Sequence, residues 1–288
     1  MSAPEPVDSI EDIILTDDRR GITALRPFLP DRFCEAAARL IPGQQGNVFI
    51  VTGFFMLCAG LPETDGPPGA LAMGRALDRL GFISYYVTDR FTAPLLEATA
   101  GDAERVITFP LADREQSERY ALDLLEDYRP SVLIATERCG ETADGRYLNI
   151  SGRDISPYNA RVDYLFHHHG RTIGIGDGGN EIGMGSLANH IPACEGLPQN
   201  PCITATTRLV IASVSNWGAY GLLAALSGLT GLDLLPAWEE EAAVLERMVA
   251  FGAVDGIDGK RVCTVDGFSL EKNRRILERL HLLVGDRS

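Results

Sequence analysis

Residues 171–185 read RTIGIGDGGNEIGMG, and this stretch joins a short apolar run directly to a polar, glycine-rich loop. An apolar run of this length that ends in glycine is typical of a buried strand in a parallel sheet. Glycine permits positive φ angles and a close approach of the backbone to a ligand. Asp177, Asn180 and Glu181 are the side chains of the loop that can carry polar chemistry. We therefore predict a strand that leads into a binding site.

The same change from apolar strand to polar loop recurs along the chain. Strands predicted at 47–53, 131–136 and 207–214 precede the polar stretches ETDG (63–66), ERCG (137–140) and SNWG (215–218). Two more strands are predicted at 82–87 and 105–109, and helices at 31–40, 69–80, 92–100, 114–128, 156–168, 238–251 and 269–283. A further helix of small residues is predicted after SNWGAYG (215–221), ending at about residue 229. Parallel strands need crossover connections, which are usually helices. We predict a doubly wound α/β fold with a mostly parallel sheet, helices on both faces and room for a small subdomain.

The predicted domain organisation is simple. Residues 1–20 are acidic and are expected to be a loosely attached lead-in, and residues 21–288 to form a single α/β domain. No basic segment followed by an apolar core occurs near the first residue, so we expect a cytoplasmic protein. The longest apolar runs are far shorter than the roughly 20 residues of a membrane span. A homo-oligomer is compatible with this composition.

The charge balance restricts the partners. The formal net charge is −14 and the isoelectric point is about 4.8, whereas nucleic-acid and anionic-membrane surfaces need clustered positive charge. We expect neither partner, and we expect a small molecule instead. The stretch GIGDGG superficially resembles a dinucleotide-binding loop, but Asp177 would lie where a pyrophosphate binds. No nucleotide cofactor is therefore expected.

Acidic side chains gather in the predicted loops. Ligands of doubly wound sheets bind beyond the carboxyl ends of the strands, so the loops should face one crevice. Glu63, Asp65, Glu137, Asp177 and Glu181 would then share one site, and they cannot all be ionised without a bound cation or raised pKa values. Mg²⁺ or Mn²⁺, an ammonium group of a substrate, or both would satisfy such a site. A structural alternative is that Asp65 only caps the helix after Pro68.

Several motifs together resemble one family. TGFF (52–55), ETDGPPGA (63–70), ERCG (137–140), GDGGNEIGMG (176–185) and SNWGAYG (215–221) occur in the order found in the D-glutamate cyclase family. The resemblance covers residues 45–270. It implies a lyase of the hydro-lyase class that converts D-glutamate into 5-oxo-D-proline and water. The amine attacks the γ-carboxyl carbon in this reaction, and a ring closes.

The chemistry of such a ring closure suggests roles for individual residues. Glu63 and Asp65 would meet the ammonium group and transfer protons, while Asp177 and Glu181 would bind a divalent cation or act as the acid. The amides of residues 176–179 and Asn180 would stabilise the oxyanion, and Asn216 would orient the substrate. The full set of expected substrate-binding residues is Thr52, Gly53, Thr64, Gly66, Glu137, Arg138, Gly178, Gly179, Asn180 and Asn216.

Two other functions use the same residues. A metal-assisted hydrolase, or an enzyme that forms or opens the lactam of another amino acid, would need the same carboxylates. A non-catalytic D-amino-acid-binding protein would bind D-glutamate without forming a product. Assays with a panel of glutamate-like compounds distinguish these functions from the cyclase.

Overall fold

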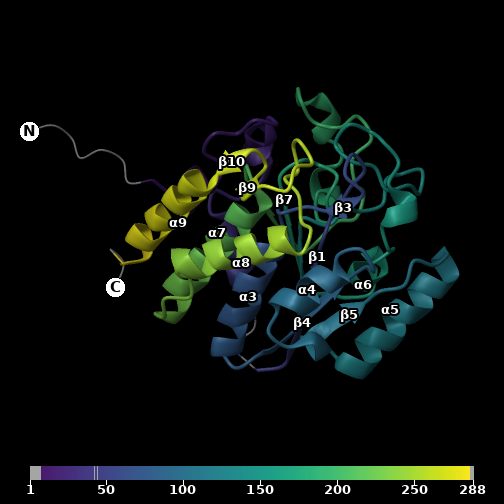
Figure 1. Ribbon diagram of the computed structural model, residues 1–288, viewed down its shortest axis with the longest axis horizontal. Coiled ribbons are helices and arrows are strands. Elements are labelled where there is room, and N and C mark those ends of the chain that lie inside the picture. The colour runs from purple at the N-terminus through teal and green to yellow at the C-terminus, as the bar shows by residue number, and fades with distance from the viewer. Residues whose placement is uncertain (1–7, 42, 44, 286–288) are drawn as a thin grey trace, which may run out of the picture.

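The computed structural model describes residues 8–41, 43 and 45–285. Its centre is a six-stranded parallel sheet with the strand order β5-β4-β1-β6-β7-β8. The strands are β1 (Asn47–Thr52), β4 (Ile83–Thr88), β5 (Val106–Thr108), β6 (Val132–Thr136), β7 (Thr172–Gly176) and β8 (Arg208–Ile211). This confirms the predicted doubly wound α/β fold (Figure 1).

Helices cover both faces of the sheet because the side chains of its strands alternate between two cores. Val48 and Ile50 of β1 belong to a large core shared with several helices, whereas Phe49 and Val51 belong to a smaller one. The large core includes residues of α1 (Ile10–Ile14), α2 (Phe33–Ala38), α3 (Pro67–Arg79), α4 (Ala93–Thr99), α7 (Ser215–Thr230), α8 (Trp238–Ala250) and α9 (Leu270–Gly285). The smaller core includes residues of α5 (Arg114–Tyr128) and α6 (Asp163–His167).

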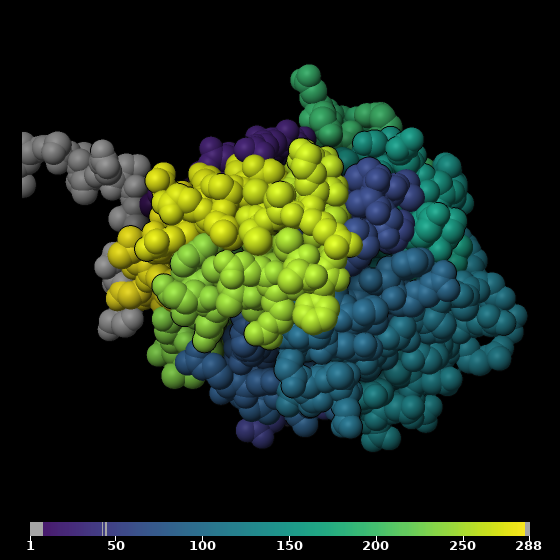
Figure 2. Space-filling model, in the orientation of Figure 1, coloured from purple at the N-terminus to yellow at the C-terminus, as the bar shows by residue number. Residues whose placement is uncertain are grey.

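Two short antiparallel pairs accompany the main sheet. They are β2 (Phe55–Met56) with β3 (Leu61–Pro62), and β9 (Thr264–Val265) with β10 (Phe268–Ser269). In Figure 2 the segment coloured for β2 and β3 lies on the surface between the yellow C-terminal segment and a teal segment from the middle of the chain. Three distant parts of the sequence therefore meet at this face.

The N-terminal segment differs from the loose attachment that we expected. Ser9 caps α1 together with Asp12, and Ile10, Ile13 and Ile14 of this helix are buried in the large core. Spacing of apolar residues by three and four is the ordinary pattern of a packed helix. Residues 1–7 lie outside the described residues, but the chain from Ile10 onward is part of the fold.

The helix predicted at 156–168 is wrong over much of its length. The structure has a 3₁₀ turn at Ser156–Tyr158 and then α6 at Asp163–His167. Between them, the carbonyl oxygen of Ala160 accepts hydrogen bonds from Arg138 Nη2 (3.0 Å) and Asn159 Nδ2 (3.1 Å). A continuous helix would use this carbonyl oxygen for a backbone hydrogen bond of its own. The two side chains bind it instead, and Asn159 has an extended backbone conformation.

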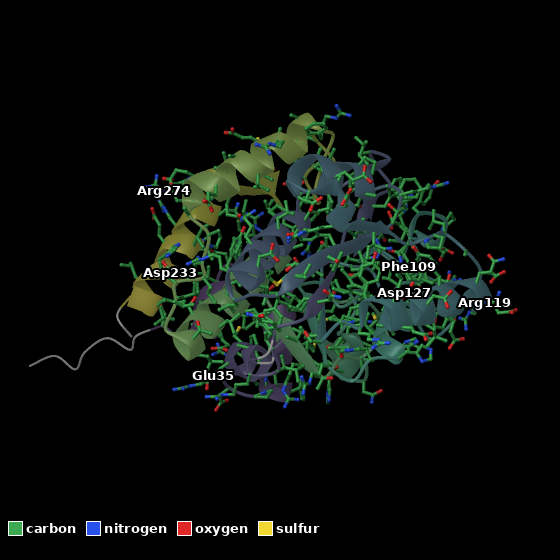
Figure 3. All side chains as sticks on the ribbon, turned by 90° about the horizontal axis from the view of Figure 1, so that it is seen from below. Glu35, Phe109, Arg119, Asp127, Asp233 and Arg274 are labelled. Carbon is green, nitrogen blue, oxygen red and sulfur yellow. The ribbon has the colours of Figure 1, made fainter. Side chains whose placement is uncertain are left out.

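Charged side chains lie mainly at the periphery. Arg119 on α5 and Arg274 on α9 lie at opposite ends of the molecule, whereas the ring of Phe109 is buried (Figure 3). No helix of the described residues combines the length and the apolar character of a membrane span. Thirteen charged residues are nevertheless buried among the described residues, and six of them, all acids, gather at one place: Glu63, Asp65, Glu137, Asp177, Glu181 and Asp266.

Candidate active site

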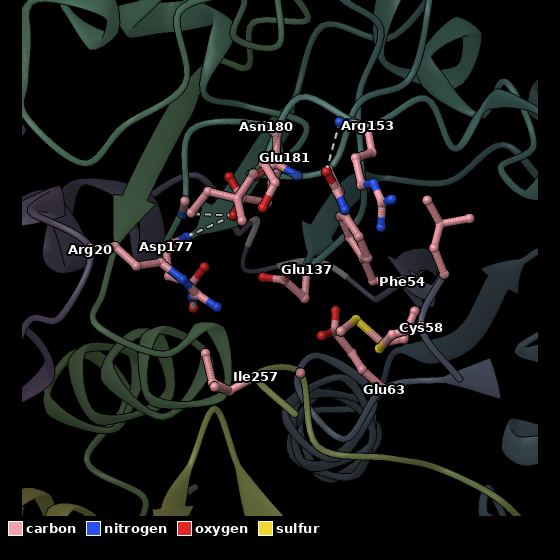
Figure 4. A pocket seen from close by; sticks show the side chains of 17 residues that line it. Arg20, Phe54, Cys58, Glu63, Glu137, Arg153, Asp177, Asn180, Glu181 and Ile257 are labelled. Carbon is pink, nitrogen blue, oxygen red and sulfur yellow. Dashed lines mark hydrogen bonds and ion pairs between the residues drawn. The ribbon is translucent and has the colours of Figure 1, made fainter. Parts of the chain in front are cut away.

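A cavity of about 330 Å³ lies at the carboxyl ends of the central strands. The chain connects β1 to β4 on one side and crosses over to β6 on the other, so β1 and β6 form the topological switch point of the sheet. Four acids line the cavity (Figure 4): Glu63 after β3, Glu137 after β6, and Asp177 and Glu181 after β7. The predicted loops do converge, and they contribute these four acids to one space.

Glu137 has a backbone conformation that is unusual for its residue type. Its φ angle is 45°, in the left-handed region that non-glycine residues rarely adopt. Its Oε2 atom accepts a 2.6 Å hydrogen bond from Ser215 Oγ, at the start of α7. Backbone strain of this kind concentrates at functional sites. The conformation places a carboxyl group at the end of a central strand, where it lines the cavity.

The glycine-rich loop after β7 binds one of its own side chains. Glu181 Oε1 accepts hydrogen bonds from the backbone amides of Gly178 (2.7 Å) and Asp177 (3.2 Å), and Oε2 accepts one from Gly179 (2.8 Å). The positive φ of Gly179 (95°) allows the tight turn. These amides, which we expected to meet an oxyanion, already have a partner. Asn180 lines the cavity while its Nδ2 donates to the carbonyl oxygen of Leu148.

Arg20, whose side chain is 19% exposed, is a half-buried cation of the site, and no pattern in the sequence indicates its role. Its Nη1 atom forms ion pairs with Asp177 and with Asp266 Oδ2, the latter at 2.8 Å. Asp266 lies between β9 and β10 and has a left-handed φ of 52°. The acidic, glycine-bearing stretch at 254–267 was a signal for Asp266, but local pattern does not place that stretch beside β7.

Asp65 and Asn216 tie two helices together behind the cavity. Asp65 accepts hydrogen bonds from the amides of Ser215 and Asn216 at the start of α7, each at 2.8 Å. Asn216 Oδ1 in turn accepts from the amides of Gly66 (3.1 Å) and Gly69 (2.8 Å) at the start of α3. Asp65 is a cap, as the structural alternative proposed, but of α7. Neither side chain lines the cavity.

The remaining predicted residues support the site from outside. The Arg138 guanidinium donates to Asp89 Oδ2 (2.7 Å) and to the carbonyl oxygens of Gly53 and Ala160 (both 3.0 Å). Thr64 donates its hydroxyl to Thr264 O at 2.8 Å. Of the other predicted residues, Thr52 ends β1, Gly53 follows it and Gly66 is the N-cap of α3, and none of the three lines the cavity. These contacts hold the loops that carry the acids.

Burial raises the pKa values of the acids. Desolvation is the largest cause for Glu63, Glu137 and Asp177, whose pKa values lie well above the usual range for carboxyl groups. Neighbouring carboxylates raise them further, and Arg20 lowers that of Asp177. Burial likewise raises the pKa of Asp65 to about 7. Glu63 Oε1 has no hydrogen-bond partner among the described residues. Burial therefore favours the protonated form of these carboxyl groups.

Two groups of acids have the spacing of a metal site. In each of the trios Asp65, Asp177, Asp266 and Glu137, Asp177, Glu181, one oxygen of every residue lies within 4.8 Å of those of the other two. Arg20 is paired with two acids of the first trio. The second trio lines the cavity and has the all-oxygen ligands that Mg²⁺ and Mn²⁺ prefer.

The outer part of the cavity comes from residues outside the predicted set of catalytic and substrate-binding residues, although Phe54 belongs to the TGFF motif. Phe54, Met56 and Leu57 form an apolar wall near β2, and Ile257 adds to it from the C-terminal segment. Asn149, Ile150, Ser151 and Arg153 line the opposite part. These residues belong to the long loop after β6, which has no strand or helix periodicity of its own.

Comparison with known proteins agrees with the resemblance in the sequence. The family model described as "D-glutamate cyclase-like, C-terminal" matches residues 10–281. The chain is 30% identical over 249 residues to the mitochondrial D-glutamate cyclase of Homo sapiens, and the alignment covers 78% of this chain and 39% of the human protein. The chain thus spans about two fifths of the length of this relative. It belongs to the D-glutamate cyclase-like, C-terminal family.

Proposed function

We propose that this protein is a D-glutamate cyclase, a lyase that converts D-glutamate into 5-oxo-D-proline and water. One observation carries the proposal: a cavity lined by four buried acids, three of which have pKa values raised by burial. The human relative bears the name of this activity. The volume of about 330 Å³ is at the lower end of ligand pockets and favours a small metabolite.

The reaction needs groups that accept and donate protons. The amine must lose two protons as the C–N bond forms, and the departing oxygen of the γ-carboxylate must gain two protons as the C–O bond breaks. The acids therefore return to their starting protonation state after each turnover. A cluster of carboxyl groups whose pKa values burial raises above their usual range suits such an exchange, because general acid–base catalysis works best when the pKa is near the working pH.

Glu63 and Glu137 are the acids best placed for proton transfer. Glu63 Oε1 has no partner among the described residues, and Glu137 uses one oxygen for Ser215. Glu181 differs, because backbone amides occupy both of its oxygens. We assign the proton transfers to Glu63 and Glu137, and to Asp177 the attraction of the substrate ammonium group beside Arg20.

We also propose that the trio Glu137, Asp177 and Glu181 can hold Mg²⁺ or Mn²⁺. A cation there would offset the repulsion between these buried carboxylates and polarise a substrate oxygen. Turnover measured after EDTA treatment, and again after addition of MnCl₂ or MgCl₂, tests this part. Full activity in EDTA would remove the metal from the proposal and leave the acid–base scheme in place.

The activity itself is tested with purified protein and either D- or L-glutamate, with 5-oxoproline followed by NMR. We expect product from D-glutamate, and a loss of 10²- to 10⁴-fold in kcat for Glu63→Gln. Asp127→Asn, at an exposed position of α5, is the matched control and should retain full activity. Thermal stabilisation by D-glutamate without product would identify a binding protein instead. Turnover of neither enantiomer rules out the cyclase.

A further inference from the structure

The outer end of the cavity is formed by the second of two consecutive tight hairpins, at residues 141–147 and 148–154. Isolated bridges join Glu141 to Tyr147 and Leu148 to Asp154. At the tip, Arg153 N donates to Asn149 Oδ1 and Asn149 N donates to Arg153 O, both at 2.9 Å. These reciprocal bonds fix the backbone from which the Arg153 side chain extends.

The first hairpin is fastened to the fold by a buried carboxylate, and the second is bonded to the first where the amide of Ile155 donates to the carbonyl oxygen of Tyr147 (2.8 Å). Asp163 accepts hydrogen bonds from Tyr147 Oη (2.7 Å), the amide of Glu141 (2.9 Å) and Thr204 Oγ1 (2.6 Å). Tyr147 also packs in a small core with Phe54, which lines the cavity. Buried contacts of the two hairpins therefore set the position of Arg153, although Arg153 itself is exposed.

The two arginines of the cavity differ in their charge partners. Arg20 is paired with Asp177 and Asp266, whereas no ion pair or hydrogen bond among the described residues involves the guanidinium of Arg153. Figure 4 shows Arg153 on the side of the cavity near Asn180 and Arg20 on the other side. The cavity thus has an acidic interior and one cation at its outer end that is not neutralised.

The geometry of ring closure gives this cation a role. The amine and the γ-carboxyl group must come together, and both must reach the acids. The α-carboxylate is then the single charged group that projects from the forming ring. We propose that Arg153 binds the α-carboxylate of the substrate, and that the cavity therefore selects amino acids whose α-carboxylate is free. This inference rests on the proposed function and adds the recognition of the substrate to it.

The α-amide of D-glutamate provides a direct test, because it keeps the amine and the γ-carboxyl group but lacks the α-carboxylate charge. Wild-type protein should turn over D-glutamate with a KM about 10- to 100-fold lower than that of the α-amide. Arg153→Gln should raise the KM for D-glutamate by a similar factor, change kcat little and leave the KM for the α-amide unchanged. Arg153→Lys should restore part of the increase in KM for D-glutamate toward the wild-type value, because lysine keeps the positive charge but lacks the planar guanidinium group.

The matched control is Arg146→Gln, because Arg146 lies on the preceding hairpin and pairs with Asp144 outside the cavity. It should leave both KM values unchanged. An equal rise for both compounds in Arg153→Gln, or no rise for either, would overturn the inference.

Calorimetric binding of the same two compounds separates this inference from the cyclase activity. Wild-type protein that binds D-glutamate but forms no product would contradict the cyclase, while preferential binding over the α-amide that Arg153→Gln abolishes would still support the role of Arg153. Wild-type protein that binds the two compounds equally, or binds neither, would contradict that role.

Discussion

Glu63 illustrates how the surroundings at this site disfavour the charged form of a single carboxyl group. Its side chain is 4% exposed, and its Oε1 atom lacks a hydrogen-bond partner among the described residues. Burial raises the pKa of Glu63, and the neighbouring acids Asp266 and Asp65 raise it further. A carboxyl group in such surroundings is far less costly when it is protonated. Substrate binding can offset the cost of the charged form by bringing an ammonium group.

The raised pKa values predict how stability depends on pH. Asp65 has a pKa of about 7 in the folded protein, whereas the ordinary pKa of an aspartate is 3.8, so between these pH values the folded state binds more protons than the unfolded state. Glu63, Glu137 and Asp177 shift in the same direction. The free energy of unfolding should therefore fall as the pH rises from 4 through 7, in the absence of substrate and metal.

Urea denaturation at pH 5 and pH 8 measures this slope. Glu63→Gln removes one buried ionisable group and should flatten the slope, whereas Asp127→Asn, at the exposed position labelled in Figure 3, should leave it unchanged. Stability that rises between pH 5 and pH 7 would show that these carboxyl groups are ionised in the folded protein.

At the scale of elements, α3 and α7 cap each other. The first two residues of α3 are Pro67 and Pro68, which have no amide hydrogen, so Gly69 provides the first amide of this helix that needs an acceptor. Asn216 from α7 supplies that acceptor, while Asp65 from the loop before α3 accepts from the first amides of α7. The positions of both helices, and of the loop that carries Glu63, depend on this exchange.

Asn216→Ala removes the acceptor for two buried amides, those of Gly66 and Gly69. We expect a loss of about 2 to 4 kcal/mol in the free energy of unfolding, at about 1–2 kcal/mol for each donor. Gln116→Ala, on the exposed face of α5, is the control and should change it by less than about 0.5 kcal/mol. A variant with wild-type stability but a raised KM would instead support the substrate-orienting role that the sequence suggested.

Elements were predictable where a long periodic pattern existed. The helix at 114–128 has the predicted bounds, because its apolar residues recur at helical spacing over four turns. The two-residue strands β2, β3, β9 and β10 are too short to show alternation, so no pattern indicates them. The helix expected at 156–168 is interrupted by Arg138, a residue distant in the sequence, and local propensity contains no information about such a contact.

At the scale of the whole molecule, the site joins segments from both ends of the chain. The sequence predicted Glu63, Glu137, Asp177 and Glu181 because each follows a strand whose carboxyl end faces the same crevice. It did not predict Arg20, because the contact depends on how the N-terminal segment crosses the molecule. The excess of acidic residues can be counted in the sequence, but the sequence does not indicate that Arg20 partly neutralises the buried ones.

Arg20 joins the segment after α1, the loop after β7 and the β9–β10 turn, so its removal should affect the whole fold. Arg20→Gln leaves Asp177 and Asp266 without their cation, and breaking a buried ion pair in this way costs about 3–5 kcal/mol. We expect this loss at pH 8 and a smaller one at pH 5, because Asp177, whose pKa is raised by burial, can then take up a proton. Arg26→Gln, which breaks a half-exposed pair with Asp12, should cost less than about 1 kcal/mol at both pH values. Urea denaturation of the two variants at both pH values tests this prediction. Equal and small losses in the free energy of unfolding would mean that Arg20 does not hold these segments together.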